Sequence, residues 1–195
     1  MATIANYFEQ AQLSLAAYTL GLQQGMFGSA AISNDPTYQN ALKDAGMSDK
    51  QAADFANTYT VVDQYSDALS GFSATVFDKG GVKYLAIRGT DPDNWGTFID
   101  LIADIGVFEG LNGQQQYQEL QLFFQSLLSS GIIQASNLYV TGHSLGGLLA
   151  QMLAVDQAGQ IAQTMTFNAP GVGGIGAEIL QSAGILPIDI PLASV

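Results

Sequence analysis

The chain contains no cysteine, and only one histidine and one arginine, among its 195 residues. Without cysteine, disulfides, thiolate metal sites and a cysteine nucleophile are excluded. Basic residues are also few, since five lysines and arginines stand against seventeen aspartates and glutamates, which gives a net charge of -12. A surface of that sign repels phosphate backbones, so we exclude nucleic acid as a partner. Any contact with lipid would have to come from apolar surface rather than from charge.

The sequence also has no apolar run long enough to span a membrane, and its first residues lack the basic start and apolar core of a signal peptide. The acidic, cysteine-free composition is compatible with export without a cleaved leader, which slightly favours an extracellular location. Carboxylates are scattered and no spacing resembles a calcium loop, so we expect no metal and no cofactor. No repeat or linker interrupts the chain, and residues 1–195 are expected to form one domain.

The most informative stretch begins at Leu138 and turns sharply at Ser144, within Gly142-His143-Ser144-Leu145-Gly146. A G-x-S-x-G pattern is typical of a nucleophile elbow, a tight bend where a strand reverses into a helix. The glycines fit because a side chain at either position would collide as the helix folds back on the strand. The bend is expected to raise the serine hydroxyl above the sheet at a helix N-terminus. There, free N–H groups and the helix dipole favour an oxygen that becomes negative during acyl transfer.

The residues around this motif agree with the interpretation. Ser136 to Thr141 has the pattern of a short strand, and Leu145 to Val155 repeats apolar residues at helical spacing. A bare G-x-S-x-G also occurs by chance, and the alternative is a serine that only caps a helix. We predict that Ser144 is a nucleophile on the turn between a strand and a helix.

The order of strand and helix patterns predicts an α/β fold. Three β-rich segments come first, Thr60–Tyr65, Gly71–Phe77 and Val82–Ile87, and the turn Asp78–Gly81 joins the last two as an antiparallel hairpin. Helices and strands then alternate, which implies crossover connections. We expect a mostly parallel α/β-hydrolase-like sheet with helices on both faces and ligands at the carboxyl ends of its strands. The other elements expected in this half are helices at Trp95–Ile105 and Gln114–Leu128 and a strand at Thr164–Asn168.

Three helices are expected before the first strand. An apolar stripe in which residues recur every three or four positions predicts an amphipathic helix that covers the sheet and ends near Gly21–Gly25. The residues of this stripe are Ile4, Tyr7, Phe8, Ala11, Leu15, Tyr18 and Leu22. Two short helices follow at Thr37–Ala45 and Ser48–Tyr59. The serine that opens the second, with Gln51 three residues later, has the pattern of a capping box.

A second informative stretch lies after the strand Val82–Ile87, where Arg88-Gly89-Thr90 leads into a polar turn. An oxyanion hole needs a second donor opposite the elbow, and a strand-end loop beside the nucleophile strand can supply one. Thr90 can offer both its N–H and its hydroxyl. Arginine at a strand end is costly to bury without a partner. We therefore expect Arg88 to anchor this loop to a carboxylate or to backbone carbonyls rather than to act in catalysis.

These motifs resemble the fungal-type (class 3) lipase family. The resemblance rests on Ile87-Arg88-Gly89-Thr90 with Asn94-Trp95, on Thr141-Gly142-His143-Ser144-Leu145-Gly146-Gly147, and on Thr166-Phe167-Asn168-Ala169-Pro170-Gly171-Val172-Gly173. It implies an α/β-hydrolase that acts on carboxylic esters of lipids, with Ser144 as nucleophile and the N–H groups of Leu145 and Thr90 as oxyanion donors. It also implies that the segment after Thr90 can act as a lid through its apolar face from Trp95 to Phe108. As an ordinary core helix, the same face needs no such role.

The base and the acid of a serine hydrolase are missing from their expected positions, because in this fold the acid and then the histidine follow the serine. His143 directly precedes the serine, and adjacent side chains of a tight turn point in different directions, so we expect it to be structural. Apart from Glu178, the only late carboxylate is Asp189. Its proline-flanked segment suits a candidate acid less well than a solvated loop residue.

The sequence ends at Val195, where a new strand starts, before the segments that would carry acid and histidine. Our hypothesis is that these residues are the N-terminal part of a longer lipase or carboxylesterase whose C-terminal part supplies both groups. The isolated chain is then expected to be nearly inactive. The opposing hypothesis is a non-catalytic module that kept the hydrolase scaffold for binding or assembly. Triglyceride, phospholipid, polyester and simple esters all stay open as substrates.

Overall fold

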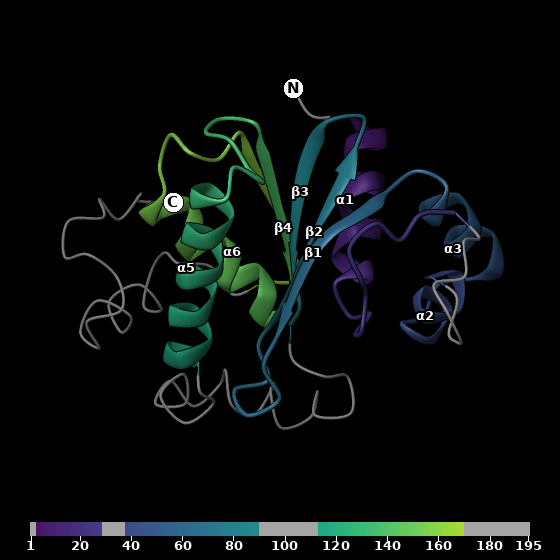
Figure 1. Ribbon diagram of the computed structural model, residues 1–195, viewed down its shortest axis with the longest axis horizontal. Coiled ribbons are helices and arrows are strands. Elements are labelled where there is room, and N and C mark those ends of the chain that lie inside the picture. The colour runs from purple at the N-terminus through teal and green to yellow at the C-terminus, as the bar shows by residue number, and fades with distance from the viewer. Residues whose placement is uncertain (1–2, 29–37, 90–112, 170–195) are drawn as a thin grey trace.

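The computed structural model describes residues 3–28, 38–89 and 113–169, which build a five-stranded sheet with helices on both faces (Figure 1). The strands lie side by side in sequence order, the first three antiparallel and the last three parallel. Their bounds are β1 (Thr60–Ser66), β2 (Ser73–Lys79), β3 (Val82–Ile87), β4 (Leu138–His143) and β5 (Gln163–Phe167). The described sheet is therefore mixed, with the predicted hairpin on one side and the predicted parallel pairing on the other.

The helices form a layer on each face of this sheet. α1, α2 and α3 cover one face, and α5 and α6 cover the other (Figure 1). Their bounds are α1 (Ile4–Ala16), α2 (Tyr38–Asp44), α3 (Asp49–Ala56), α5 (Gly113–Ser129) and α6 (Leu145–Asp156). Leu13, Phe55 and Phe77 belong to the core under α1 to α3, and Leu85 and Phe124 to the core under α5 and α6. The predicted α/β architecture is confirmed in the described residues.

β3, β4 and β5 end at the same edge of the sheet. Ile87 pairs with Gly142 across β3 and β4, and His143 pairs with Phe167 across β4 and β5. Because parallel strands bring their carboxyl ends together, the residues that follow these three strands start from one edge. This edge carries the turn at Ser144, where the sequence predicts the site.

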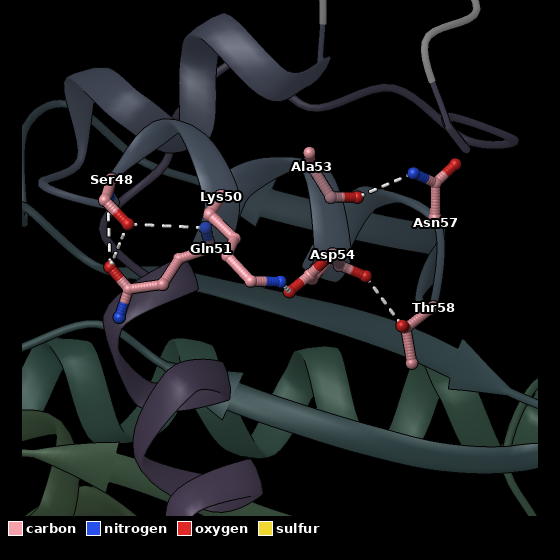
Figure 2. Close-up of polar contacts among 7 residues, drawn as sticks. All are labelled: Ser48, Lys50, Gln51, Ala53, Asp54, Asn57 and Thr58. Atoms are coloured by element: carbon pink, nitrogen blue, oxygen red, sulfur yellow. Dashed lines mark hydrogen bonds and ion pairs between the residues drawn. The ribbon is translucent and has the colours of Figure 1, made fainter.

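α3 begins with the capping box that its sequence predicts. Ser48 Oγ accepts a hydrogen bond from the Gln51 backbone N–H at 3.3 Å, and Gln51 Oε1 accepts one from the Ser48 backbone N–H at 3.0 Å (Figure 2). At the other end of the helix, Asn57 Nδ2 donates to the carbonyl of Ala53 at 2.8 Å (Figure 2). At the start of α3, local side chains therefore satisfy backbone N–H groups that have no acceptor within the helix. At its end, the Asn57 side chain adds a second bond to the Ala53 carbonyl, which also accepts from the Asn57 backbone N–H.

α1 is shorter than its apolar pattern predicts. It ends at Ala16 rather than near Gly21–Gly25, because the N–H of Thr19 turns back to the Ala16 carbonyl at 3.0 Å. The next segment is held by Gln64 on β1, whose Nε2 donates to the Thr19 carbonyl at 2.7 Å and whose Oε1 accepts from the Leu22 N–H at 2.9 Å. Bonds to a distant strand thus outweigh the local helical periodicity.

Part of the apolar stripe of α1 is exposed, because the residues in the first turns of the helix are not buried. Ile4, Tyr7 and Phe8 are 88%, 53% and 58% exposed. The residues that α1 buries are Gln10, Leu13, Ser14 and Ala16. The prediction that this helix covers the sheet is confirmed for the later part of α1. The apolar residues of its first turns do not take part, because helical spacing repeats whether or not a sheet lies beneath that part of the helix.

Several predicted features lie outside the described residues. These are Thr90, Glu178, Asp189, the helical pattern Trp95–Ile105 and the lid role of the segment that contains it. Within residues 3–28, 38–89 and 113–169, no helix has the length and apolar character needed to cross a membrane.

Candidate active site

The predicted strand-to-helix bend is present at Ser144, between the last residue of β4 and the first residue of α6. Its backbone has φ 58° and ψ -126°, a conformation that a residue with a side chain keeps only where its surroundings enforce it. The Ser144 N–H donates to the carbonyl of Phe167 on β5 at 2.9 Å, and its carbonyl accepts from the N–H of Gly147 at 3.0 Å. The bend is therefore held by backbone bonds on both sides.

Glycines allow this bend because no side chain fits at their positions. A Cβ on Gly142 would lie 2.4 Å from the carbonyl of Gly146, and a Cβ on Gly146 would lie 2.3 Å from the carbonyl oxygen of Ile87. A Cβ on Gly147 would lie 2.5 Å from that of Ala169. In a close-packed interior such overlaps force the backbone apart. The start of α6 therefore lies directly against the ends of β3 and β4, as the motif predicts.

The side chain of Ser144 is enclosed and unpaired. Its exposed fraction is 0%, and Oγ has no hydrogen-bond partner among the described residues. The hydroxyl at this bend is therefore buried rather than open to solvent. The side chain also makes no capping bond to α6, so Ser144 does not fit the alternative of a serine that only caps a helix. A buried hydroxyl without a partner costs about 1–3 kcal/mol, and such a group calls for a specific reason to be kept.

The hydroxyl lies at the N-terminus of α6. Leu145 is the first residue of α6, and the first N–H groups of a helix have no acceptor within it. The helix dipole adds positive potential at the same point. Thr90 lies outside the described residues, but the residue before it, Gly89, adjoins the elbow. A Cβ on Gly89 would lie 3.3 Å from the Cβ of Ser144.

Arg88 anchors the end of β3. Its Nη2 donates to the carbonyl of Gly71, between β1 and β2, at 2.6 Å, and its backbone N–H donates to the carbonyl of Ser73 at 2.9 Å. A bond from a charged donor is stronger than one between neutral groups, so this contact ties the β3 end to the hairpin half of the sheet. The predicted anchoring to a backbone carbonyl is confirmed.

His143 is bound to Tyr18 rather than to the serine beside it. His143 Nδ1 lies 3.1 Å from the Tyr18 hydroxyl oxygen, and the two rings are tilted by 58° with centroids 6.3 Å apart. Burial lowers the pKa of the imidazole from its ordinary value, so the ring is neutral at neutral pH. Since no described group bonds to Ser144 Oγ, His143 does not act as its base in this geometry.

Tyr18 is the residue of this site that the sequence analysis missed. It stands 125 positions before His143 and was assigned to the apolar stripe of the first helix. The available signal was its hydroxyl, because a tyrosine packed against a protein core usually has a polar partner, whereas Leu15 and Leu22 of the same stripe need none. The identity of that partner could not be read from the sequence.

No model of a protein family matches the chain, and no curated protein matches it. Similar chains are found among solved structures. The lipase from Rhizopus microsporus var. chinensis is 16% identical with a TM-score of 0.43, over 95% of this chain and 65% of that one. The Rhizomucor miehei lipase in its propeptide complex is 15% identical with a TM-score of 0.46, over 95% and 60%. The extracellular lipase from Serratia marcescens is 16% identical with a TM-score of 0.43, over 85% and 37%.

These solved chains are lipases. The sequence motifs resemble the same class of protein. The chain spans less than two thirds of the length of the first two, and identities of 15–16% with TM-scores below 0.5 carry no argument about chemistry. What the site can do therefore follows from its own residues.

Proposed function

We propose that this chain carries the nucleophile and the oxyanion site of a serine lipase or carboxylesterase. In the proposed reaction, Ser144 Oγ attacks the ester carbonyl, the alcohol leaves, and water hydrolyses the acyl-enzyme. The observation that supports this most is the state of Ser144, with φ 58° and a buried hydroxyl that has no partner among the described residues. Strained backbone and unpaired polar groups cluster at functional sites, where the surrounding packing holds them in place.

The proposed oxyanion donors are the backbone N–H groups of Leu145 and Thr90. Leu145 begins α6, where the helix has unpaired N–H groups and a positive dipole end. Thr90 follows Gly89, which adjoins Ser144. Two donors on opposite sides of the carbonyl oxygen stabilise the negative charge that forms there, and loss of one such donor slows acyl transfer by about a hundredfold to a thousandfold.

We propose that a histidine base is supplied by residues outside these 195. A serine hydroxyl is a weak nucleophile until a base takes its proton. The sequence contains a single histidine, His143, and that ring is bound to Tyr18. The acid is proposed to come from the same missing C-terminal part, with Asp189 as the candidate within the chain. On its own, the chain then has only the residual catalysis that binding and oxyanion donors provide.

The proposed substrate is a lipid ester or another ester with an apolar acyl group. Two of the residues that follow Ser144 in α6, Leu145 and Leu148, are apolar and buried. A net charge of -12 gives no attraction to anionic surfaces, so the recognition of such a substrate would rest on apolar contact. An extracellular location is proposed together with this activity.

A second candidate function is a binding or assembly module that has a hydrolase fold and no catalysis. One observation favours it. The only histidine of the chain is bound to Tyr18, and Ser144 Oγ has no partner among the described residues that could activate it.

Ester turnover distinguishes the two functions. The 195-residue chain, and an extended chain that continues through the codons after Val195 in its gene, are each assayed with p-nitrophenyl butyrate beside their Ser144→Ala variants. The extended chain should turn over the ester, and Ser144→Ala should lower kcat by more than about a thousandfold. The 195-residue chain should be nearly inactive.

Each other outcome contradicts a specific part of the proposal. Turnover by the extended chain that survives Ser144→Ala contradicts the nucleophile. Fast turnover by the 195-residue chain that Ser144→Ala abolishes places the base within these residues. A stop codon after Val195, together with no turnover that depends on Ser144, favours the binding module.

A further inference from the structure

Three segments that are far apart in the sequence meet at Gly89. A Cβ built on Gly89 would lie 2.7 Å from the hydroxyl oxygen of Tyr18 and 2.4 Å from the carbonyl oxygen of His143. The same atom would lie 3.3 Å from the Cβ of Ser144. The hydroxyl of Tyr18 also reaches His143 Nδ1, at 3.1 Å. One tyrosine therefore contacts both the end of β3 and the residue that precedes the elbow serine.

We propose that Tyr18 is a positioning residue that holds the end of β3, at Gly89, against the elbow at His143 and Ser144. Its hydroxyl bonds the imidazole of His143 on the nucleophile side and packs on the bare α-carbon of Gly89 on the other side. Tyr18 acts through these two residues and not on the substrate itself. The inference rests on the proposed function, to which it adds the residue that fixes the position of Gly89 relative to Ser144.

Tyr18 can serve this purpose because its own segment is anchored to the sheet. The residue after it, Thr19, accepts a hydrogen bond through its carbonyl from Gln64 Nε2 on β1 at 2.7 Å. The preceding helix is pinned to the nucleophile strand, since Thr141 Oγ1 donates to the carbonyl of Gln10 at 3.2 Å. The early end of α1 is thus what directs the tyrosine toward the strand ends.

The bond from Tyr18 also restrains the ring of His143. A hydrogen bond at Nδ1 selects one tautomer and one ring orientation of a neutral imidazole. The ring belongs to the residue directly before Ser144, so a ring free to rotate would loosen the packing at the elbow. Acyl transfer is sensitive to such loosening, because misplacement by about 1 Å can cost about a hundredfold in rate.

The single histidine makes this contact directly measurable. Tyr18→Phe keeps the ring and removes only the hydroxyl, and Tyr7→Phe makes the same change at an exposed tyrosine of α1. In nitrogen NMR of the 195-residue chain, the Nδ1 resonance of His143 and the amide of Gly89 should move in Tyr18→Phe and stay unmoved in Tyr7→Phe. If they stay unmoved in Tyr18→Phe, the proposal is overturned.

Kinetics of the extended chain provide the second readout. Tyr18→Phe should lower kcat about tenfold and change KM by less than about twofold, because the substrate is still bound but the reacting groups are less well placed. Tyr7→Phe should change neither constant. Moved resonances with an unchanged kcat overturn the positioning role, since the contact then exists without affecting the site.

The failure of the proposed function has a different signature. If no turnover depends on Ser144, the proposed function is overturned and the catalytic part of this inference fails with it. The NMR comparison of Tyr18→Phe with Tyr7→Phe still shows, without any reaction, whether Tyr18 holds the two strand ends together.

Discussion

Two serines begin helices in the described part of this protein, and they are held in opposite ways. Ser48 opens α3 with φ -66° and ψ 161°, and it exchanges hydrogen bonds with Gln51 (Figure 2). Ser144 opens α6 with φ 58°, and its side chain makes no capping bond and is completely buried. The first serine is satisfied by residues within one turn of the chain. The second is kept in place by strands far away in the sequence, which is how a strained and unpaired group persists in a folded protein.

The largest loss of stability is expected for substitution of a glycine at the start of α6, where close packing holds Ser144 in place. A Cβ on Gly146 would lie 2.3 Å from the carbonyl oxygen of Ile87, so we expect Gly146→Ala to lower the free energy of unfolding by about 3 kcal/mol in urea titrations. The control is Gly80→Ala in the β2–β3 turn, where a Cβ meets nothing within 4 Å but φ is +60°. Backbone strain alone should cost about 1 kcal/mol there. Equal losses in the two variants would show that close packing does not hold the elbow.

Removal of the Ser48 hydroxyl at the start of α3 should lower the free energy of unfolding by an intermediate amount. Ser48→Ala deletes the side chain that accepts from the Gln51 N–H, and the loss of such a cap lowers the free energy of unfolding by about 1 kcal/mol. Ser129→Ala, at an exposed serine in the last turn of α5, is the matched control and should cost less than about 0.5 kcal/mol. Urea titration measures both variants. A loss at Ser48 no greater than at Ser129 would mean that the capping box contributes little to stability.

Serine to alanine at Ser144 should not lower the free energy of unfolding as it does at Ser48. Ser144→Ala removes a buried hydroxyl that has no partner among the described residues, so the free energy of unfolding should stay the same or rise by up to about 1 kcal/mol. The measurement is the urea titration used for Ser48→Ala, with the loss of ester turnover as the accompanying observation. A loss of stability like that at Ser48 would assign Ser144 a structural role and would weaken the proposed function.

The smallest effect expected is on the pH dependence of stability. Burial lowers the pKa of His143, so the unfolded chain binds a proton more readily than the folded state. The contribution of this residue is therefore fully present above its ordinary pKa of 6.5 and is lost as the pH falls through the lower folded value. The free energy of unfolding should fall between about pH 7 and pH 5, above the range in which most carboxylates titrate.

His143→Gln is the variant that isolates this effect. Glutamine does not titrate, so the slope of stability between about pH 7 and pH 5 should be absent. Urea titrations at several pH values measure it, with Tyr7→Phe as a control that leaves the histidine unchanged. A slope that persists in His143→Gln would assign the pH dependence to other groups.

Local signals account for the parts of the fold that the sequence predicted well. The capping box at Ser48 and the strand Val82–Ile87 agree with the structure because hydrogen-bonding groups and side-chain alternation within a few residues specify them. The bend at Ser144 was predictable for a related reason, since the positions of Gly142 and Gly146 exclude most other backbone paths. The motif by itself implies that the helix packs on the strand.

Predictions that depended on distant partners were less successful. The early end of α1 follows from Gln64, whose side chain binds the segment after the helix. No residue near Ala16 gives a sequence signal that the helix ends there. The exposure of Ile4 and the contact from Tyr18 to His143 could not be read from periodicity either. A periodic pattern states which residues share a face, but not what that face meets.

The sequence by itself determined the conformation of the elbow, because glycines on both sides of Ser144 leave room for a helix to start against a strand. It also determined the antiparallel pairing of β2 and β3, through one short turn, and the parallel pairing of the strands that follow, through their crossovers. Only the tertiary structure decided the surroundings of the serine. The burial of its hydroxyl follows from how the strands and helices pack. The residue that holds His143 stands 125 positions away from it, and local sequence does not encode their meeting.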